Sequence, residues 1–454
     1  MLPSWGILMN FIPNSTIKSN MLKETGLKDI DELFSDIPKQ IQINNLNLSK
    51  GLSQQETEQK LKEIANKNNS MPSFLGGGIK PHYISPAVKS IISRSEFYTA
   101  YTPYQPEASQ GFLQAMFEYQ SMISEITGMD ISNASLYDGA TALGEVALMC
   151  SRINQKKTFV IPQNISWEKK SVLKNYAKGP EIKIREISYN TKTGKIDLDK
   201  LKKNIDNDIT GVYIENPNFF GVFEDDVEKI CKIVKDNNSV FVVGVDPVSL
   251  GIAKSPGAYG ADIVIGEGRA FGNPMDFGGS SLGIFACKNE FLRQMPGRII
   301  GMTKDFDGRR AFCMTIQTRE QHIRRGKATS NICTNEGLCA LTAVTYLAWL
   351  GGDGLEELSK INFEKGQKLA KMIGSINGFE KRFTGTHFNE FVIKSKINPN
   401  KINKDLLKKG VQGGLILDKC YPELKDCMLF GVSEMHTDKD MEKLVSTLKE
   451  VSHV

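Results

Sequence analysis

Three short stretches each place polar residues directly after an apolar run or at an expected helix start. Asp246 ends the apolar run "SVFVVGVD", and Arg269 follows "ADIVIGEG", 23 residues further along the chain. The stretch "YDGATALGE" places Asp138, Gly139 and Thr141 at an expected helix start, where backbone N–H groups bind anions. Because parallel strands end at one edge of their sheet, we expect these residues to share a pocket.

This arrangement resembles the site of enzymes that use pyridoxal phosphate (PLP). In such enzymes an acid after one strand pairs with the pyridine nitrogen, and a lysine after a later strand binds the cofactor covalently. Asp246 is placed like that acid, but the lysine position is Arg269. A guanidinium stays protonated and offers no nucleophilic amine. The residues therefore predict a PLP-type fold without its own covalent cofactor. An ordinary strand-end acid and an ordinary ion-pairing arginine remain the alternative.

Two other lysines lie near these stretches in the sequence. Lys254 comes only eight residues after Asp246, in a connection, and Lys288 follows the next apolar run, "SLGIFAC". We expect Lys288 at the far end of the sheet or on the surface. Because the chemistry needs an amine at one specific place, both are poor substitutes for a lysine at Arg269.

Short apolar runs alternate with helical segments between residues 158 and 268, which is typical of βαβ units. This pattern predicts an α/β fold whose large domain has a mostly parallel sheet flanked by helices. We expect an N-terminal helical segment over residues 1–85 and the large domain over 86–335. Linking helices, separated at "GGDG", and a small C-terminal α/β domain of strand, helix, strand and helix should occupy residues 336–454.

Composition excludes several classes of function. A net charge of +5 over 454 residues, without a dense basic cluster, does not favour nucleic-acid binding. The eight cysteines form no C-x-x-C pair and the five histidines are scattered, so we propose no metal site. The N-terminus lacks a basic region and a cleavage site, and we expect no membrane span. The expected location is the cytoplasm.

Longer motifs carry a specific resemblance. The stretches "SRSEFYTAYTPYQPEASQGFLQAMFEYQSMISEITGMD" (93–130), "NASLYDGATALGEVALM" (133–149) and "QTREQHIRRGKATSNICTNEGL" (317–338) resemble the glycine-cleavage-system P-protein family. They are similar to glycine dehydrogenase (decarboxylating) subunit 1, the alpha subunit of the two-chain form. "FIPNS", "IDELFSDIP" and "FLGGG" fit the same subunit. The resemblance runs from about Met9 to the C-terminus, so Met9 is the expected natural start and residues 1–8 an extension.

The resemblance implies a PLP-transferase fold of type I and an α2β2 assembly. In that assembly the second subunit carries the lysine and PLP, and this chain binds no covalent cofactor. The complex decarboxylates glycine and passes the aminomethyl group to the lipoyl arm of H-protein, with T-protein and L-protein as functional partners. This chain alone is then expected to be inactive, which accounts for Arg269 at the lysine position.

The resemblance also gives a role to the loop "YTAYTPYQPE" (98–107). Its two prolines make the loop stiff, and Tyr98, Tyr101, Tyr104 and Gln105 supply aromatic and polar groups. A phenol can both pack and donate a hydrogen bond, so these residues are candidates for the wall of the partner's pocket. Packing at the subunit interface alone is the alternative.

Basic residues between 319 and 327 form a second candidate contact surface. Arg319, His322 and Arg324 could face H-protein or a substrate carboxylate, but a structural ion-pair network is the expected role. Two rival functions remain open at this stage. One is an autonomous PLP enzyme that uses another lysine, and the other is a non-enzymatic scaffold or regulator that has kept the fold.

Overall fold

A computed structural model describes residues 17–43, 47–98, 100–315, 321–330 and 332–452, except for the side chain of His322. The chain separates into two compact units, residues 1–69 and 70–454. The boundaries predicted from the sequence, at residues 85 and 335, differ from this division and stay predictions.

The first unit consists of short helices. They are α1 (Lys18–Glu24), η2 (Ile30–Phe34), η3 (Lys39–Ile41) and α2 (Gln54–Ala65), where η denotes a 3₁₀ helix. The start of α2 is a capping box, as the sequence predicts: the Ser53 hydroxyl accepts the Glu56 N–H, and the Glu56 carboxylate accepts the Ser53 N–H. None of the four helices contains a buried residue.

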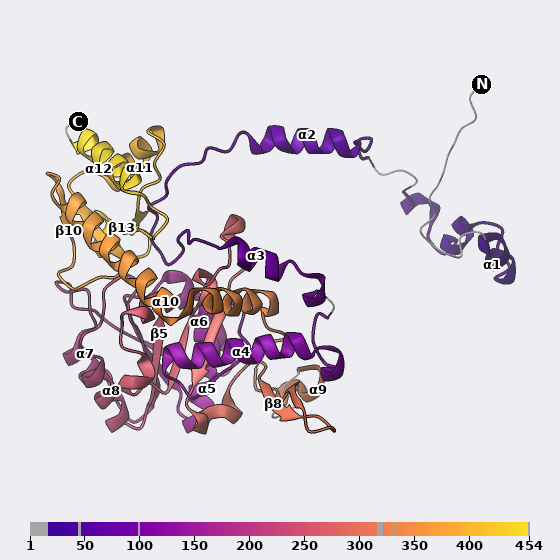
Figure 1. The fold of residues 1–454 in the computed structure, drawn as a ribbon, viewed down its shortest axis with the longest axis horizontal. Helices are drawn as coiled ribbons and strands as arrows, with labels where there is room; N and C mark the ends of the chain where they lie inside the picture. The colour runs from indigo at the N-terminus through magenta and orange to yellow at the C-terminus, as the bar shows by residue number, and fades with distance from the viewer. Residues whose placement is uncertain (1–16, 44–46, 99, 316–320, 331, 453–454) are drawn as a thin grey trace. The chain divides into compact units, whose positions relative to one another are not determined.

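The second unit is built around a large sheet against which helices pack (Figure 1). This sheet has seven strands in the order β1-β7-β6-β5-β4-β2-β3. The strands are β1 (Ile131–Ser132), β2 (Thr158–Pro162), β3 (Lys183–Ile187), β4 (Ile209–Glu215), β5 (Val240–Val245), β6 (Ile263–Glu267) and β7 (Gly283–Cys287). Neighbouring strands from β3 to β6 are parallel, whereas β7 runs antiparallel to β6 and β1 antiparallel to β7. The predicted mostly parallel sheet is therefore confirmed.

Helices cover both faces of this sheet. They include α3 (Pro86–Ile92), α4 (Gln110–Thr127), α5 (Gly139–Asn154), α6 (Trp167–Lys178), α7 (Leu198–Asn204) and α8 (Val227–Asp236). Successive residues of a strand point to opposite faces. Val243 of β5 accordingly belongs to the core that holds α4 and α8, while Val242 belongs to the core that holds α5 and α6.

Short helical turns connect the main elements of the large sheet. They are η4 (Ser95–Phe97), η5 (Pro106–Ala108), η6 (Pro247–Gly251), η7 (Pro256–Tyr259), η8 (Gly268–Ala270), η9 (Asp276–Gly278), η10 (Asn289–Gln294), α9 (Gln321–Arg324) and η11 (Arg325–Lys327). Two of them, η6 and η8, directly follow β5 and β6. They therefore carry the chain past the sheet edge at which the polar residues were predicted to gather.

A long helix, α10 (Gly337–Gly374), links the two sheets of this unit. The sequence predicts two helices separated at "GGDG", and the structure places a break at Gly351, with φ 69° and ψ 177°. Glycine adopts this conformation without a Cβ clash. By length and composition α10 could cross a bilayer. Its N-terminal half instead buries residues such as Leu341 and Tyr346 against α4 and α3, as a core helix does.

The C-terminal part forms a small antiparallel sheet in the order β10-β11-β13-β12. Its elements are β10 (Phe379–Lys381), β11 (Glu390–Ser395), α11 (Pro399–Lys408), β12 (Leu415–Ile416), η12 (Pro422–Leu424), β13 (Cys427–Gly431) and α12 (Asp438–Ser452). Phe391, Phe430 and Leu444 share one buried core with the end of α10. The predicted succession of strand, helix, strand and helix is confirmed, with β10 and β12 added.

Residues 70–85, called the strap below, run from the small sheet toward the large one. Ser73 pairs with Gln412, and Leu75 pairs with Phe430 of β13. Further along, Ser85 caps α3 by accepting the Ala87 N–H. The strap therefore touches both parts of the second unit.

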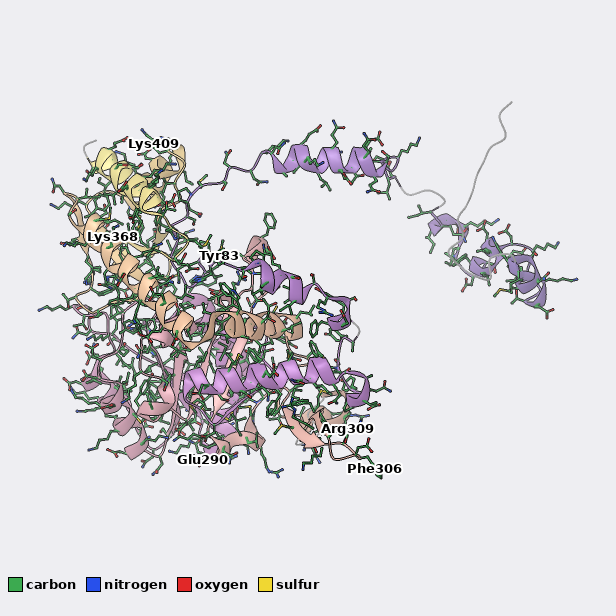
Figure 2. The ribbon with its side chains drawn as sticks, in the orientation of Figure 1. Tyr83, Glu290, Phe306, Arg309, Lys368 and Lys409 are labelled. Atoms are coloured by element: carbon green, nitrogen blue, oxygen red, sulfur yellow. The ribbon has the colours of Figure 1, made fainter. Side chains whose placement is uncertain are left out.

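A two-stranded hairpin, β8 (Ile300–Lys304) and β9 (Arg310–Met314), lies beside α4. The Asp305 N–H donates to the Arg309 carbonyl across the turn. Phe306 at the tip is fully exposed (Figure 2). The hairpin was not among the elements predicted from the sequence.

Candidate functional site

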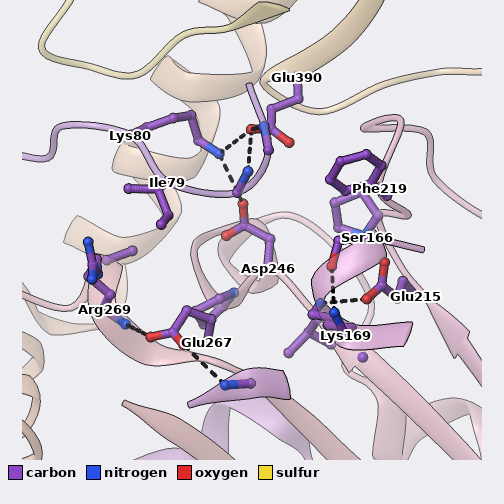
Figure 3. Close-up of a pocket in the computed structure, with 18 of the residues that line it drawn as sticks. Ile79, Lys80, Ser166, Lys169, Glu215, Phe219, Asp246, Glu267, Arg269 and Glu390 are labelled. Carbon is purple, nitrogen blue, oxygen red and sulfur yellow. Dashed lines mark hydrogen bonds and ion pairs between the residues drawn. The ribbon is translucent and has the colours of Figure 1, made fainter. Parts of the chain in front are cut away.

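A cavity of about 270 Å³ lies at the carboxyl ends of β4, β5 and β6 (Figure 3). Its wall also includes the starts of α5 and α6, the strap and the start of β11. The acidic and basic side chains that line it are His82, Lys80, Lys169, Arg269, Asp138, Glu168, Glu215, Asp246, Glu267 and Glu390. The structure thus brings Asp138, Gly139, Asp246 and Arg269 to one pocket, while Thr141 lies behind it in the first turn of α5.

Arg269 follows β6 and is 4% exposed. Its Nη2 atom donates to the carbonyl of Gly278, while its Nε and Nη1 atoms have no hydrogen-bond partner. This side chain therefore holds the loop after η8. It supplies no amine to the pocket, because a guanidinium does not lose its proton in this pH range.

Asp246 is paired with a lysine of the strap. Lys80 Nζ lies 4.0 Å from the Asp246 carboxylate and 3.1 Å from that of Glu390. Burial by itself lowers the pKa of Lys80, but Glu390 and Asp246 outweigh burial and hold the pKa above its usual value. Lys80 is therefore a buried ammonium group that bridges the large and small sheets.

The start of α5 is occupied by carboxylates of the chain itself. The Asp138 Oδ1 atom accepts the Thr141 N–H at 2.6 Å, which caps the helix. The Glu267 carboxylate accepts the N–H groups of Gly139 at 3.1 Å, Arg269 at 3.1 Å and Leu282 at 2.9 Å. Burial raises the pKa of Glu267, although these three donors oppose the shift. Two of the N–H groups that an anionic ligand could use at the start of α5, those of Gly139 and Thr141, are thus already engaged.

A second lysine faces the cavity from α6. Lys169 forms an ion pair with Glu215 at the end of β4, and Glu215 also accepts the Tyr213 hydroxyl at 2.8 Å. Burial lowers the pKa of Lys169, but Glu215 outweighs it and the pKa lies above its usual value. Lys169 is therefore also an ammonium group at neutral pH and not a free nucleophile.

The two lysines weighed from the sequence lie away from the cavity. Lys254 is exposed and pairs with Glu228 at 2.7 Å. Lys288 pairs at 2.8 Å with Asp262, which precedes β6 and so marks the opposite edge of the sheet. Neither side chain lines the pocket.

The tyrosine loop lies on the surface of the second unit. Tyr98, Tyr101 and Tyr104 are 59%, 84% and 55% exposed, and Gln105 is exposed as well. The guanidinium of Arg298 lies 5.9 Å from the centre of the Tyr104 ring. None of these four residues lines this chain's own cavity. Their aromatic surface therefore faces outward.

The predicted basic surface is described only in part. Arg319 lies outside the described residues, and so does the side chain of His322. Arg324 ends α9 and is exposed. Arg324 has no ion pair with a carboxylate of the described residues. A structural ion-pair network for this group stays a prediction.

Sequence reasoning missed the other charged residues of the pocket, among them Lys80, Lys169, Glu267 and Glu390. Lys80 and Glu390 are 310 positions apart, and no periodic pattern connects them. One local signal was available in "GGGIK", because Gly77 and Gly78 adopt φ values of 110° and 93° and donate their N–H groups to Glu390. A glycine pair of this kind indicates close approach of the backbone to another group.

The large sheet with its pocket at the strand ends and the small C-terminal sheet define a PLP-transferase-like fold of type I. A solved sphingosine-1-phosphate lyase from Burkholderia pseudomallei has this fold, with a TM-score of 0.65 at 12% identity over 92% of this chain and 94% of that chain. The model of the glycine cleavage system P-protein family matches residues 9–448. The chain belongs to the glycine cleavage system P-protein family.

Relatives in this family match over nearly their whole length. A probable glycine dehydrogenase (decarboxylating) subunit 1 from Thermococcus onnurineus is 47% identical over 98% of this chain and 99% of its own. The protein of the same name from Saccharolobus islandicus is 46% identical over 97% of both chains. A crystal structure of glycine decarboxylase (P-protein) of the glycine cleavage system, in inhibitor-bound form, superposes with a TM-score of 0.88 at 37% identity. That match covers 95% of this chain and 97% of the other.

The fold class implies PLP, but the residues of this pocket do not fit a covalently bound molecule of it. The lysine position is Arg269, and the acid at the pyridine position, Asp246, is already paired with Lys80. At the helix start, the half-buried Glu267 carboxylate accepts the N–H of Gly139, where a phosphate would need that donor. Each group that covalently bound PLP would need is therefore either replaced or already engaged by another residue of the chain.

Proposed function

We propose that this chain is the subunit of a two-chain glycine decarboxylase that does not carry the cofactor. The observation that carries the proposal is Arg269 at the lysine position, in a pocket whose charged groups satisfy one another. Membership of the P-protein family and relatives named "subunit 1" support it. The chain contributes to glycine decarboxylation as part of a complex and is inactive alone.

The assembly we propose is an α2β2 heterotetramer in the cytoplasm. The second subunit, glycine dehydrogenase subunit 2, carries PLP on its own lysine. Lipoylated H-protein receives the aminomethyl group from the complex, and T-protein and L-protein act on the product afterwards. Neither nucleic acid nor membrane takes part.

The tyrosine loop is proposed to complete the partner's pocket. Tyr98, Tyr101 and Tyr104 are more than half exposed, which leaves their phenols available to another chain. Gln105 adds an amide beside them. Arg319, His322 and Arg324 are candidates for contact with an acidic partner or a substrate carboxylate, although a structural ion-pair network is their expected role.

An autonomous PLP enzyme is the less favoured function. Lys80 and Lys169 are the lysines that line the cavity in the part of the chain that the structure describes, and both are ion-paired. An ammonium held by a carboxylate does not attack a carbonyl carbon. No specific observation favours a purely regulatory scaffold.

Reconstitution tests the proposal directly. Carbon dioxide release from [1-¹⁴C]glycine is measured with lipoylated H-protein for this chain, for subunit 2 and for their mixture. Activity is expected in the mixture and not in this chain alone. Turnover by this chain without subunit 2 would overturn the proposal, and so would a mixture no more active than subunit 2 by itself.

A further inference from the structure

The described residues of the first unit, 17–43 and 47–69, have no hydrophobic core of their own. Within residues 17–43 and 47–69, twelve large apolar side chains are exposed, with exposed fractions between 38% and 77%. These exposed side chains are Ile17, Met21, Ile30, Leu33, Phe34, Ile37, Ile41, Ile43, Leu48, Leu52, Leu61 and Ile64. No residue of this described part is buried. The unit therefore has secondary structure but nothing of its own to cover its apolar groups.

The exposed apolar area is large enough for a stable interface. Twelve side chains at these exposures present on the order of 1,000 Å² in all, against about 800 Å² per partner in a standard interface. Single exposed leucines are ordinary on a protein surface, but an apolar surface of this size marks a site of interaction. The segment thus has the area of one half of a protein–protein interface.

The helix α2 shows how this surface is organised. Leu61 and Ile64 are three residues apart, so they lie on one face, and they are 60% and 51% exposed. The capping box at Ser53 and Glu56 fixes the start of the helix without tertiary contacts. The helix is thus formed locally, with its apolar face open to a partner, as in helix-in-groove recognition.

We propose that residues 17–43 and 47–65, called the arm, bind an apolar surface of the cofactor-carrying second subunit. This inference rests on the two-chain assembly of the proposed function. The polar linker "NKNNS" (66–70) separates the arm from the strap, which is itself fixed at Ser73 and Leu75. The arm of one chain then holds its partner while the body of that chain keeps its own core.

A pair of double variants of α2 tests the apolar face. Leu61→Gln with Ile64→Gln removes it, whereas Lys60→Gln with Glu63→Gln changes neighbouring charged positions and serves as the control. Affinity for purified subunit 2 is measured by titration calorimetry with the full-length chain. The first variant is expected to bind at least about thirtyfold more weakly, because two large apolar side chains lose their burial. The control is expected to stay within about twofold.

Amide hydrogen exchange separates the possible occupants of the surface. The arm is expected to exchange fast in the isolated chain and to become protected when subunit 2 is added. Protection already present in the isolated chain would mean that the arm covers its own body and would overturn the proposal. Concentration-dependent protection in the isolated chain would point to a second copy instead and would also overturn it.

The test is independent of catalysis. Binding is measured without glycine or H-protein, so an assembly that binds through the arm but does not decarboxylate glycine would refute only the proposed function. Conversely, if the mixture is fully active and the Leu61→Gln, Ile64→Gln variant binds subunit 2 with unchanged affinity, only the proposed binding role of the arm is refuted. Thermal unfolding of the body should not differ between the two double variants.

Discussion

Lys80 Nζ lies 4.0 Å from the carboxylate of Asp246, the residue placed where the acid of a PLP site would stand. The same ammonium lies 3.1 Å from Glu390 of the small sheet. A group of the chain therefore takes the place that a cofactor's pyridinium would need. The pocket keeps the charge pattern of a PLP site but uses it to join two parts of the second unit.

Replacing Lys80 by methionine should destabilise the chain strongly. The change leaves the Asp246 and Glu390 carboxylates without their cation, and a buried pair broken in this way costs about 3 kcal/mol or more. Lys254→Met is the matched control, because its pair with Glu228 is exposed and contributes less than about 1 kcal/mol. Urea unfolding of the isolated chain measures both. Equal midpoints for the two variants would contradict a bridging role for Lys80.

Stability should fall with rising pH through the titration of Glu224. Burial raises the pKa of this carboxyl from 4.5 to about 7, although the Ile196 N–H and the Asn218 amide donate to it. The folded state therefore keeps a proton that the unfolded chain loses between these values. The unfolding free energy should decline across this window by at most about 3 kcal/mol and then level off.

The variant Glu224→Gln isolates this effect. Its unfolding free energy, measured in urea from pH 4.5 to 7.5, should lack that part of the decline. Other groups titrate equally in both proteins, so the difference between them reports Glu224 alone. Parallel curves for the two proteins would show that this carboxyl is ionised in the fold.

Arg269→Lys should not convert this chain into an enzyme. The new amine would stand at the lysine position, but Glu267 would still engage Gly139 and Lys80 would still pair with Asp246. Loss of the bond to the Gly278 carbonyl should also make the loop of η9 more sensitive to proteolysis. We expect no glycine decarboxylation by the lone variant, measured as carbon dioxide release. A fully active lone variant would mean that the rest of the pocket is intact for PLP.

The tyrosine loop should matter to the complex and not to the isolated chain. Tyr101 is 84% exposed, so Tyr101→Phe should leave thermal unfolding within about 1 °C. If its phenol reaches the partner's pocket, kcat of the complex should fall with little change in subunit affinity. Phe306→Leu, at the exposed hairpin tip, is the control. A loss of affinity without a change in kcat would assign Tyr101 to interface packing alone.

Local signals in the sequence were enough to predict much of the fold. The apolar runs before Asp246 and Arg269 are β5 and β6, since buried strands need continuous apolar residues. Ser53 with Glu56 predicted the start of α2, and "GGDG" predicted the break at Gly351, because both depend on neighbouring residues only. The convergence of Asp138, Asp246 and Arg269 followed from the rule that parallel strands end at one edge.

The partners of these residues could not be predicted in the same way. The ion pairs of Lys80 join the strap to β11 and to the end of β5, so they depend on how separate elements pack. Glu267 carries no local signal in the sequence, and its role appears only when the start of α5 lies against it. Long-range charge pairing of this kind leaves no period in the sequence.

The absorption spectrum of the chain with PLP, followed by borohydride reduction and mass spectrometry, tests the central claim most directly. The spectrum is recorded for this chain alone and for its mixture with subunit 2. We predict a reducible cofactor band only in the mixture, with the covalent label on subunit 2. A stoichiometric label on a lysine of this chain alone would contradict the account, because that lysine would then bind the cofactor covalently in place of Arg269.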